Sequence, residues 1–324
     1  MQFVAIRCYH APMRLRVLSF AAALLMTAAC LGQDPAVHRA SLDLSRGIPL
    51  VRVLIDGRGP FQFVVDTGTS CEAIVSPRLM ERLHLAPTGT TRITDLGGRS
   101  THSLDEVELD SVQLAGEEFR PVRAVVTDLP DGDAVFDGIL GFRLFRDQLL
   151  TLDFRRHKLL LSEGRLAGSR NSDVLPMRMR GGIPEVELTA GGAPFEAAID
   201  SGGIDLSLTQ EVARGLKFAA APETVALGKT QVSSFPLLGG VLENAIRLDG
   251  HRFPQPFVEV NPLFPIANLG ARAMQDFAVT FDQRSGLVEF ASENTVHLLP
   301  RPEPVGGTNK EELIGVVYVT HTYN

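Results

Sequence analysis

The chain has 324 residues, of which 44% are hydrophobic and 21% charged, as is ordinary for a globular protein. Its net charge of −7, with basic residues scattered along the sequence, leaves no basic footprint for nucleic acid. Trp is absent, whereas Gly and Pro number 30 and 20, which favours many short strands joined by tight turns. The composition therefore indicates an all-β fold.

The first part of the chain predicts a secretory signal. Arg14 and Arg16 form a positively charged stretch, and an apolar run follows over residues 17–26. This run is too short for a membrane-spanning helix, so we expect a cleaved signal peptide over residues 1–29. Met13 is an alternative start, because Met13-Arg14-Leu15-Arg16 already forms a complete positively charged n-region.

The end of this segment leaves two modes of export open. Its Ala-Ala-Cys ending resembles a bacterial lipobox, in which Cys30 would be lipidated after cleavage, but Thr27 stands where that pattern prefers Leu. Cleavage after Ala29 without lipidation is the alternative. Both predict an exported protein of the bacterial cell envelope, either periplasmic or held at the membrane by the lipid alone.

Comparison of the sequence with itself reveals an internal duplication. Four landmarks recur in the same order: a Pro-Phe pair, an Asp-[Thr/Ser]-Gly triplet six residues on, a Leu-Gly segment, and an Asp twelve residues later. In the first copy they are Pro60-Phe61, Asp66, Ile139-Leu140-Gly141 and Asp153. In the second copy they are Pro194-Phe195, Asp200, Asn268-Leu269-Gly270 and Asp282. The Leu-Gly glycines follow their aspartates by 75 and 70 residues, so we expect two copies of one unit.

Each copy predicts β structure, because short alternating or β-branched apolar runs lie between Gly, Pro and Asp turns. The predicted strands cover residues 51–55, 61–65, 107–114 and 149–154 in the first copy, and residues 184–188, 195–199, 277–281 and 287–290 in the second. One helix is expected after each aspartate, over residues 76–83 and 209–216, with Thr209 as N-cap of the second. The predicted domains are an N-terminal lobe (36–162), a polar linker (163–173), a C-terminal lobe (174–292) and a Pro-rich tail (293–324).

The two triplets are the candidate catalytic elements. A single Asp-[Thr/Ser]-Gly is usually a turn, but here each Asp ends an apolar run and the context recurs once in each copy. Two copies packed about a pseudo-twofold axis would bring Asp66 and Asp200 together. Carboxylates that share a site hold one proton between them and can activate a water molecule, a chemistry that needs no metal or cofactor.

The triplets and the Leu-Gly segments resemble the pepsin–retropepsin clan of aspartic proteases, over roughly residues 45–292. The resemblance implies two retropepsin-like β-barrel lobes related by a pseudo-twofold axis, each with a short helix, in a monomer. It implies an endopeptidase that acts on a polypeptide without a cofactor, with Asp66 and Asp200 as the catalytic pair and Thr67 and Ser201 as an interlocked hydroxyl grip. The residues expected to support the site are Thr67, Gly68, Thr69, Ser201, Gly202, Leu140, Gly141, Leu269 and Gly270.

The second copy departs further from the family pattern than the first. Thr69 fits a family position whose hydroxyl bonds the catalytic carboxylate, but Gly203 has no hydroxyl, so we expect Asp200 to be less supported. Asn268 replaces an apolar residue. No Tyr lies between residues 10 and 317 to serve in a flap, for which residues 93–100 are the candidate. These departures keep a catalytically inactive peptide-binding protein of the cell envelope as the alternative.

Other features are assigned structural roles. Cys71, the one cysteine beyond the signal region, lies in an apolar stretch and is expected in the core. Asp153 and Asp282 precede hairpin turns and are interpreted as turn residues. Gly228-Lys229-Thr230 resembles the end of a phosphate-binding loop, but it lacks that loop's first glycine and predicts a turn or a second flap. The dispersed histidines predict no zinc site.

Overall fold

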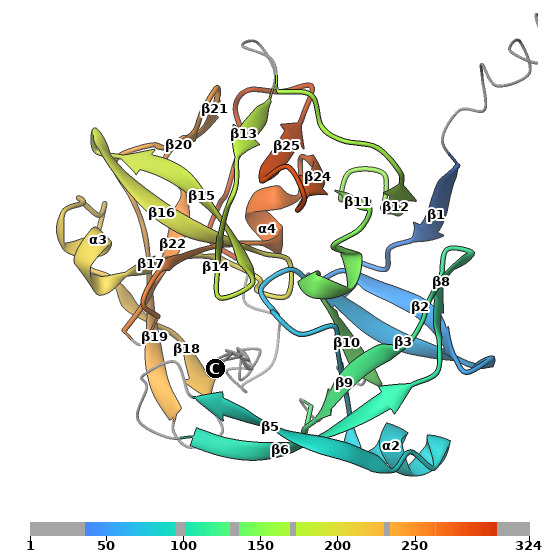
Figure 1. Ribbon diagram of the computed structural model, residues 1–324. Helices are drawn as coiled ribbons and strands as arrows, with labels where there is room; N and C mark the ends of the chain where they lie inside the picture. Colours follow the sequence, from blue (N-terminus) through green and yellow to red (C-terminus); the bar gives the residue numbers. More distant parts are fainter. Residues whose placement is uncertain are drawn as a thin grey trace, which may run out of the picture. The chain divides into compact units, whose positions relative to one another are not determined.

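The computed structural model describes residues 36–94, 101–129, 136–168, 173–229, 234–262 and 264–302. The expected signal peptide, Cys30 and the tail beyond residue 302 lie outside these residues. The described elements belong to the unit that begins at Val37. Within the described part of the chain the strands form three sheets, which confirms the all-β prediction (Figure 1).

The first large sheet is built from the first half of the chain. In order of pairing, its nine strands are β5 (Pro87–Thr94), β6 (Thr101–Leu109), β9 (Val122–Val126), β4 (Ala73–Val75), β10 (Gly138–Gly141), β3 (Arg58–Asp66), β2 (Leu50–Ile55), β7 (Val112–Leu114) and β8 (Glu117–Phe119). Helix α2 (Pro77–Leu83) follows β4, with Ser76 as its N-cap and Pro77 at its first position. A 3₁₀ helix, η2 (Phe142–Phe145), follows β10.

The second large sheet is built from the second half. Its main path, in order of pairing, is β18 (Glu223–Lys229), β19 (Ser234–Val241), β22 (Phe257–Asn261), β17 (Leu206–Thr209), β23 (Ala267–Gly270), β16 (Ala193–Asp200), β15 (Ile183–Ala190), β20 (Ile246–Leu248) and β21 (His251–Phe253); β14 (Arg178–Arg180) pairs with β15 off this path. Helix α3 (Gln210–Arg214) follows β17 and has Thr209 as its N-cap, as predicted. Helix α4 (Ala271–Met274) follows β23.

Apart from β14, the two large sheets repeat each other strand for strand. Read in chain order, the strands occupy the same places in both pairing orders, with the yellow and orange strands of Figure 1 repeating the blue and green ones. The senses of pairing also agree, because β3 and β10 run parallel as do β16 and β23. The sequence duplication is therefore a duplication of connectivity.

The third sheet joins the two halves of the chain. Its order is β1 (Val37–Ser41), β12 (Lys158–Ser162), β11 (Leu149–Asp153), β24 (Ala278–Asp282), β25 (Leu287–Ala291) and β13 (Val174–Pro176). In Figure 1 it brings together blue, green and red strands, which come from the beginning, middle and end of the described chain. Antiparallel pairing of β11 with β24 places Leu152 opposite Val279, both buried, in the centre of this sheet.

Two predictions about individual elements are corrected or extended. The strand predicted over residues 107–114 is two strands, β6 and β7, because Ser111 turns the chain and exchanges hydrogen bonds with Asp56. Helices η2 and α4 were not predicted, since each is a single turn after a Leu-Gly segment. The described start of the tail packs against the second half of the chain, with Leu299 buried and its carbonyl bonded to Phe257.

Candidate active site

Each candidate aspartate ends a strand that is buried on both faces. Strand β3 runs into Asp66 through Phe63, Val64 and Val65, all of which are at most 1% exposed. Strand β16 runs into Asp200 in the same way. Because the strands before them are apolar and buried, both carboxyl groups lie in the interior, where Asp66 is 1% and Asp200 3% exposed.

The two Leu-Gly segments lie directly beside the aspartate loops, as predicted. Gly141 is in register with Asp66 and Gly270 with Asp200, while Leu140 and Leu269 are buried behind them. The residue after each glycine binds the loop by its amide: Phe142 donates to the Thr69 carbonyl and Ala271 to the Gly203 carbonyl, both at 2.8 Å. A side chain on either glycine would collide with the loop backbone, so both positions require glycine.

The two aspartate loops contact each other reciprocally. A Cβ atom at Gly68 would lie 2.5 Å from the Cγ and Oδ1 atoms of Asp200. A Cβ atom at Gly202 would lie 2.6 and 2.7 Å from the two carboxyl oxygens of Asp66. Each triplet glycine thus lies against the carboxyl group of the other triplet, and the two carboxyl groups share one site.

Thr67 and Ser201 form an interlocked set of hydrogen bonds beneath the carboxyl groups, as predicted. The Thr67 hydroxyl donates to the Ile199 carbonyl at 2.6 Å, and the Ser201 hydroxyl donates to the Val65 carbonyl at 2.7 Å. Each hydroxyl also accepts from the other residue's backbone amide, at 3.0 Å for the Thr67 amide and 2.9 Å for the Ser201 amide. All four groups are buried, so this grip ties the two loops together in both directions.

Asp66 is held by two donors from its own loop. The Gly68 amide donates to Oδ1 at 2.8 Å and the Thr69 hydroxyl donates to Oδ2 at 2.7 Å. Burial raises the pKa of Asp66 well above its ordinary value, and the charge of Asp200 adds to this rise, which the bond from Thr69 partly offsets. Such a pair favours a shared proton over two ionised carboxylates.

Asp200 is held differently. The Gly202 and Gly203 amides both donate to its Oδ1 at 2.9 Å, so it receives two donors, as Asp66 does. Both amides bind the same oxygen, however, whereas the Thr69 hydroxyl binds the second oxygen of Asp66, so the Gly203 amide does not take the place of the missing hydroxyl. Gly203 also makes room for a neighbour, since a Cβ there would lie 2.5 Å from the Asn268 amide nitrogen. The two departures of the second copy are therefore linked, because the Asn268 side chain occupies space that a side chain at position 203 would need.

A repeated Gly-Ile-Pro segment completes the site and escaped the sequence comparison. Gly47-Ile48-Pro49 precedes β2 and Gly182-Ile183-Pro184 leads into β15, the two strands that pair with the aspartate strands. A Cβ atom on Gly47 would lie 3.8 Å from the side chain of Ile204. A Cβ atom on Gly182 would lie 2.9 Å from the side chain of Ser70. Each segment therefore contacts the aspartate loop of the other half, and its repetition in the sequence was the available signal.

The arms of the proposed flap form the β5–β6 hairpin, in which Thr94 pairs with Thr101, and residues 95–100 lie outside the described residues. Gly228 and Lys229 belong to strand β18 of the matching hairpin, and Thr230 lies outside the described residues. Cys71 is buried in an apolar cluster, where burial raises the pKa of its thiol, which confirms a core residue.

Asp153 and Asp282 are turn residues, as predicted. Each accepts a bond from the backbone amide three residues on, Arg156 at 2.9 Å and Ser285 at 3.1 Å. These bonds close the β11–β12 and β24–β25 hairpins. The second repeated acid pair therefore stabilises the third sheet rather than forming another acid site.

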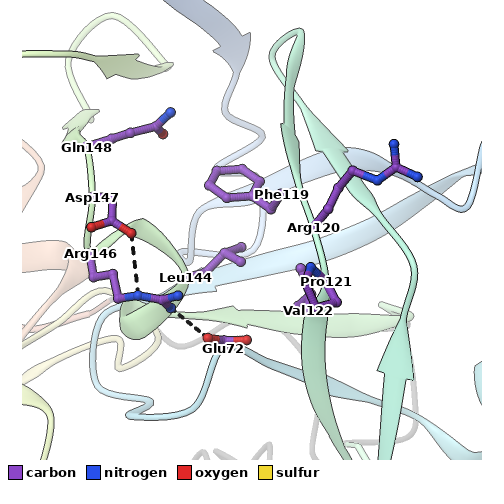
Figure 2. Close-up of a pocket in the computed structure, with 9 residues that line it drawn as sticks. All are labelled: Glu72, Phe119, Arg120, Pro121, Val122, Leu144, Arg146, Asp147 and Gln148. Carbon is purple, nitrogen blue, oxygen red and sulfur yellow. Dashed lines mark hydrogen bonds and ion pairs between the residues drawn. The ribbon is translucent and has the colours of Figure 1, made fainter.

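Figure 2 shows a surface pocket whose lining includes neither candidate aspartate. Arg146 pairs there with Glu72 at 2.6 Å and with Asp147 at 3.5 Å (dashed lines). Glu72 also accepts the Arg123 amide at 3.0 Å, so both of its carboxylate oxygens are bonded within the protein. We assign this pocket no catalytic role.

No helix among the described residues is long and apolar enough to cross a membrane. The described His, Cys, Asp and Glu side chains form no group of three or more that could hold a metal ion.

Comparison with known proteins relates part of the chain to one family. Residues 51–144 match the family model described as aspartyl protease. The match spans Asp66 and the first Leu-Gly segment, and it relates the chain to the aspartic protease clan, as the sequence predicted. No curated protein matches the chain. The second half, with Asp200, lies beyond the matched residues and is tied to the first by the duplication alone.

Proposed function

We propose that this protein is an aspartic endopeptidase that hydrolyses peptide bonds with a water molecule activated between Asp66 and Asp200. The observation that carries the proposal is the reciprocal contact of the two triplets, in which each glycine lies against the other triplet's carboxyl group. An arrangement of two retropepsin-like lobes about a pseudo-twofold axis accounts for it, because such an axis makes every contact occur twice. A single chain then supplies both halves of the site as a monomer.

The chemistry follows from the shared site. Two buried carboxyl groups in contact retain one proton between them, since two like charges there repel strongly. The ionised member takes a proton from the bound water, while the protonated member donates a hydrogen bond to the substrate carbonyl oxygen. The water oxygen attacks the carbonyl carbon and forms a tetrahedral diol. Transfer of a proton to the leaving nitrogen then breaks the peptide bond.

The loop amides and hydroxyls hold the two carboxyl groups in the orientation that catalysis requires. Their donors fix the orientation of both carboxyl groups before substrate arrives, which lowers the cost of reorganisation in the transition state. Gly68 and Gly202 permit the close approach of the two loops. Thr67 and Ser201 lock that approach from below.

A catalytically inactive peptide-binding protein of the cell envelope is the second candidate. Its support is the altered second loop, in which Asp200 has amide donors where Asp66 has a hydroxyl. Cleavage of a denatured protein by the purified chain separates the two candidates. The enzyme should cleave it, a pepstatin-like statine should block the cleavage, and a chelator should not. Statine binding without cleavage would favour the inactive protein.

We further propose that the protein is exported, through the signal predicted over residues 1–29. The two routes differ at Cys30, which lipidation would attach to the membrane. Palmitate labelling that disappears in Cys30→Ala would establish the anchor. Release of an unlabelled wild-type protein into the periplasm would establish simple secretion.

A further inference from the structure

A row of side chains crosses each large sheet next to its aspartate. The first row crosses β2, β3, β10, β4 and β9 and consists of Leu50, Val64, Ile139, Ile74 and Val125. The second row crosses the equivalent strands β15, β16, β23, β17 and β22 and consists of Glu185, Ala198, Asn268, Ser207 and Glu259. Because side chains alternate along a strand, Val64 and Ala198 share the face of the aspartates two residues on. The two rows are therefore equivalent walls beside the candidate pair.

The two walls differ in chemistry at almost every position. The first row is entirely apolar and forms, with Cys71 and Phe136, a buried cluster of its own. In the second row two acids, an amide and a hydroxyl replace aliphatic side chains, and the four are at most 7% exposed. Asp205, five residues after Asp200, also stands where Cys71 follows Asp66. The half of the site around Asp200 thus has a polar and acidic wall.

Part of this polar wall is satisfied within the protein. The Ser207 hydroxyl donates to Glu259 at 3.2 Å, and Asp205 forms an ion pair with Arg272. Glu185 forms an ion pair with Arg180 at 2.9 Å through its Oε1 atom. Buried polar atoms are costly unless they find such partners, so any that remain unpaired require an explanation.

Two acceptors in the second row have no hydrogen-bond partner among the described residues. Glu185 Oε2 and Asn268 Oδ1 are buried and accept no hydrogen bond in the described part of the chain. Their strands flank β16, which carries the small side chain of Ala198 between them where the first row has Val64. A ligand that lies over Ala198 would meet two acceptors, one of which is the second oxygen of the carboxylate that Arg180 pairs with. Lysine and arginine side chains offer only donors and a positive charge, so they match this set.

We propose that this wall binds a basic side chain of the peptide substrate, at the residue next to the scissile bond on the Asp200 side. The apolar wall beside Asp66 receives an apolar side chain on the other side of the bond. The inference rests on the proposed function for its placement at the scissile bond, but the basic-residue site itself is a binding property. An acidic side chain would be rejected there by the carboxylates.

Binding and cleavage can be tested separately. The probes are blocked alanine peptides with Phe-Lys or Lys-Phe at their centre, and matching peptides with norleucine in place of Lys. Calorimetry with Asp66→Asn protein measures binding without cleavage. One of the two lysine peptides should bind about tenfold more tightly than its norleucine match, as a charged hydrogen bond predicts. Equal affinity within both pairs would overturn the inference, and this comparison needs no variant of the wall.

The wall residues are then tested in the same Asp66→Asn background. Glu185→Gln and Asn268→Ile should each reduce the preference for lysine, while Glu187→Gln should leave it unchanged. Glu187 is the matched control, because it lies on the same strand and face as Glu185 but is exposed. A lysine preference that survives both wall substitutions would overturn the assignment. If the wild-type protein binds lysine peptides selectively but cleaves none of them, the proposed function is rejected. The basic-residue site is then still supported.

Discussion

Thr67 and Ser201 hold each other across 134 residues of sequence, each through its hydroxyl and its backbone amide. The bond from each hydroxyl to a backbone carbonyl of the other strand also has a counterpart in the opposite direction. Because the bonds are reciprocal, the loss of either hydroxyl should disturb the geometry of both carboxyl groups.

Thr67→Val should weaken both the fold and the proposed activity. The substitution keeps the shape but leaves the Ser201 amide and the Ile199 carbonyl buried without their partner, at a cost of roughly 2 kcal/mol or more. Thr151→Val is the matched control, since the Thr151 hydroxyl bonds Thr280 at 2.8 Å in the third sheet. Chemical denaturation and peptide cleavage should show that Thr151→Val loses only stability. Unchanged cleavage in Thr67→Val would contradict the role of the grip.

Gly68→Ala should abolish cleavage even where the protein still folds. The added methyl group would lie 2.5 Å from the Asp200 carboxyl group, so the two loops must separate. Gly250→Ala is the control, because a Cβ atom at Gly250 meets nothing within 4 Å. Cleavage rates and circular dichroism of both variants check this expectation. An active Gly68→Ala protein would show that the loops do not need to approach so closely.

Glu259 should make the protein less stable as pH rises towards neutrality. Burial, together with the charge of Asp205, raises the pKa of Glu259 from 4.5 to about 7, with Ser207 and Arg272 acting against the rise. The folded state therefore favours the protonated form. This contribution to the free energy of unfolding is complete below pH 4.5 and is lost as pH rises through about 7.

The loss is at most about 3 kcal/mol and should be absent in Glu259→Gln. Urea denaturation of both proteins between pH 4 and 8 measures it, with Glu187→Gln as an exposed control on the same sheet. Parallel stability curves for wild type and Glu259→Gln would show that Glu259 titrates normally.

The sequence revealed the frame of the site because its landmarks are local. An apolar strand, an aspartate and a glycine turn are visible in ten residues, and their repetition linked Asp66 to Asp200 before any contact was known. The prediction over residues 107–114 failed because the break at Ser111 depends on Asp56, which is distant in the sequence. The close approach of Asn268 to Gly203 and the polar wall beside Asp200 depend on strand register, which sequence periodicity alone does not supply.

Cleavage by Asp66→Asn and Asp200→Asn tests the central claim most directly. Each variant keeps the size of the side chain but removes the shared proton, so each should lose at least about a hundredfold in cleavage rate on a denatured protein while its fold remains intact. Asp153→Asn, at the other repeated aspartate of the first half, should cleave like the wild type. Full activity in either Asp66→Asn or Asp200→Asn would contradict a catalytic pair.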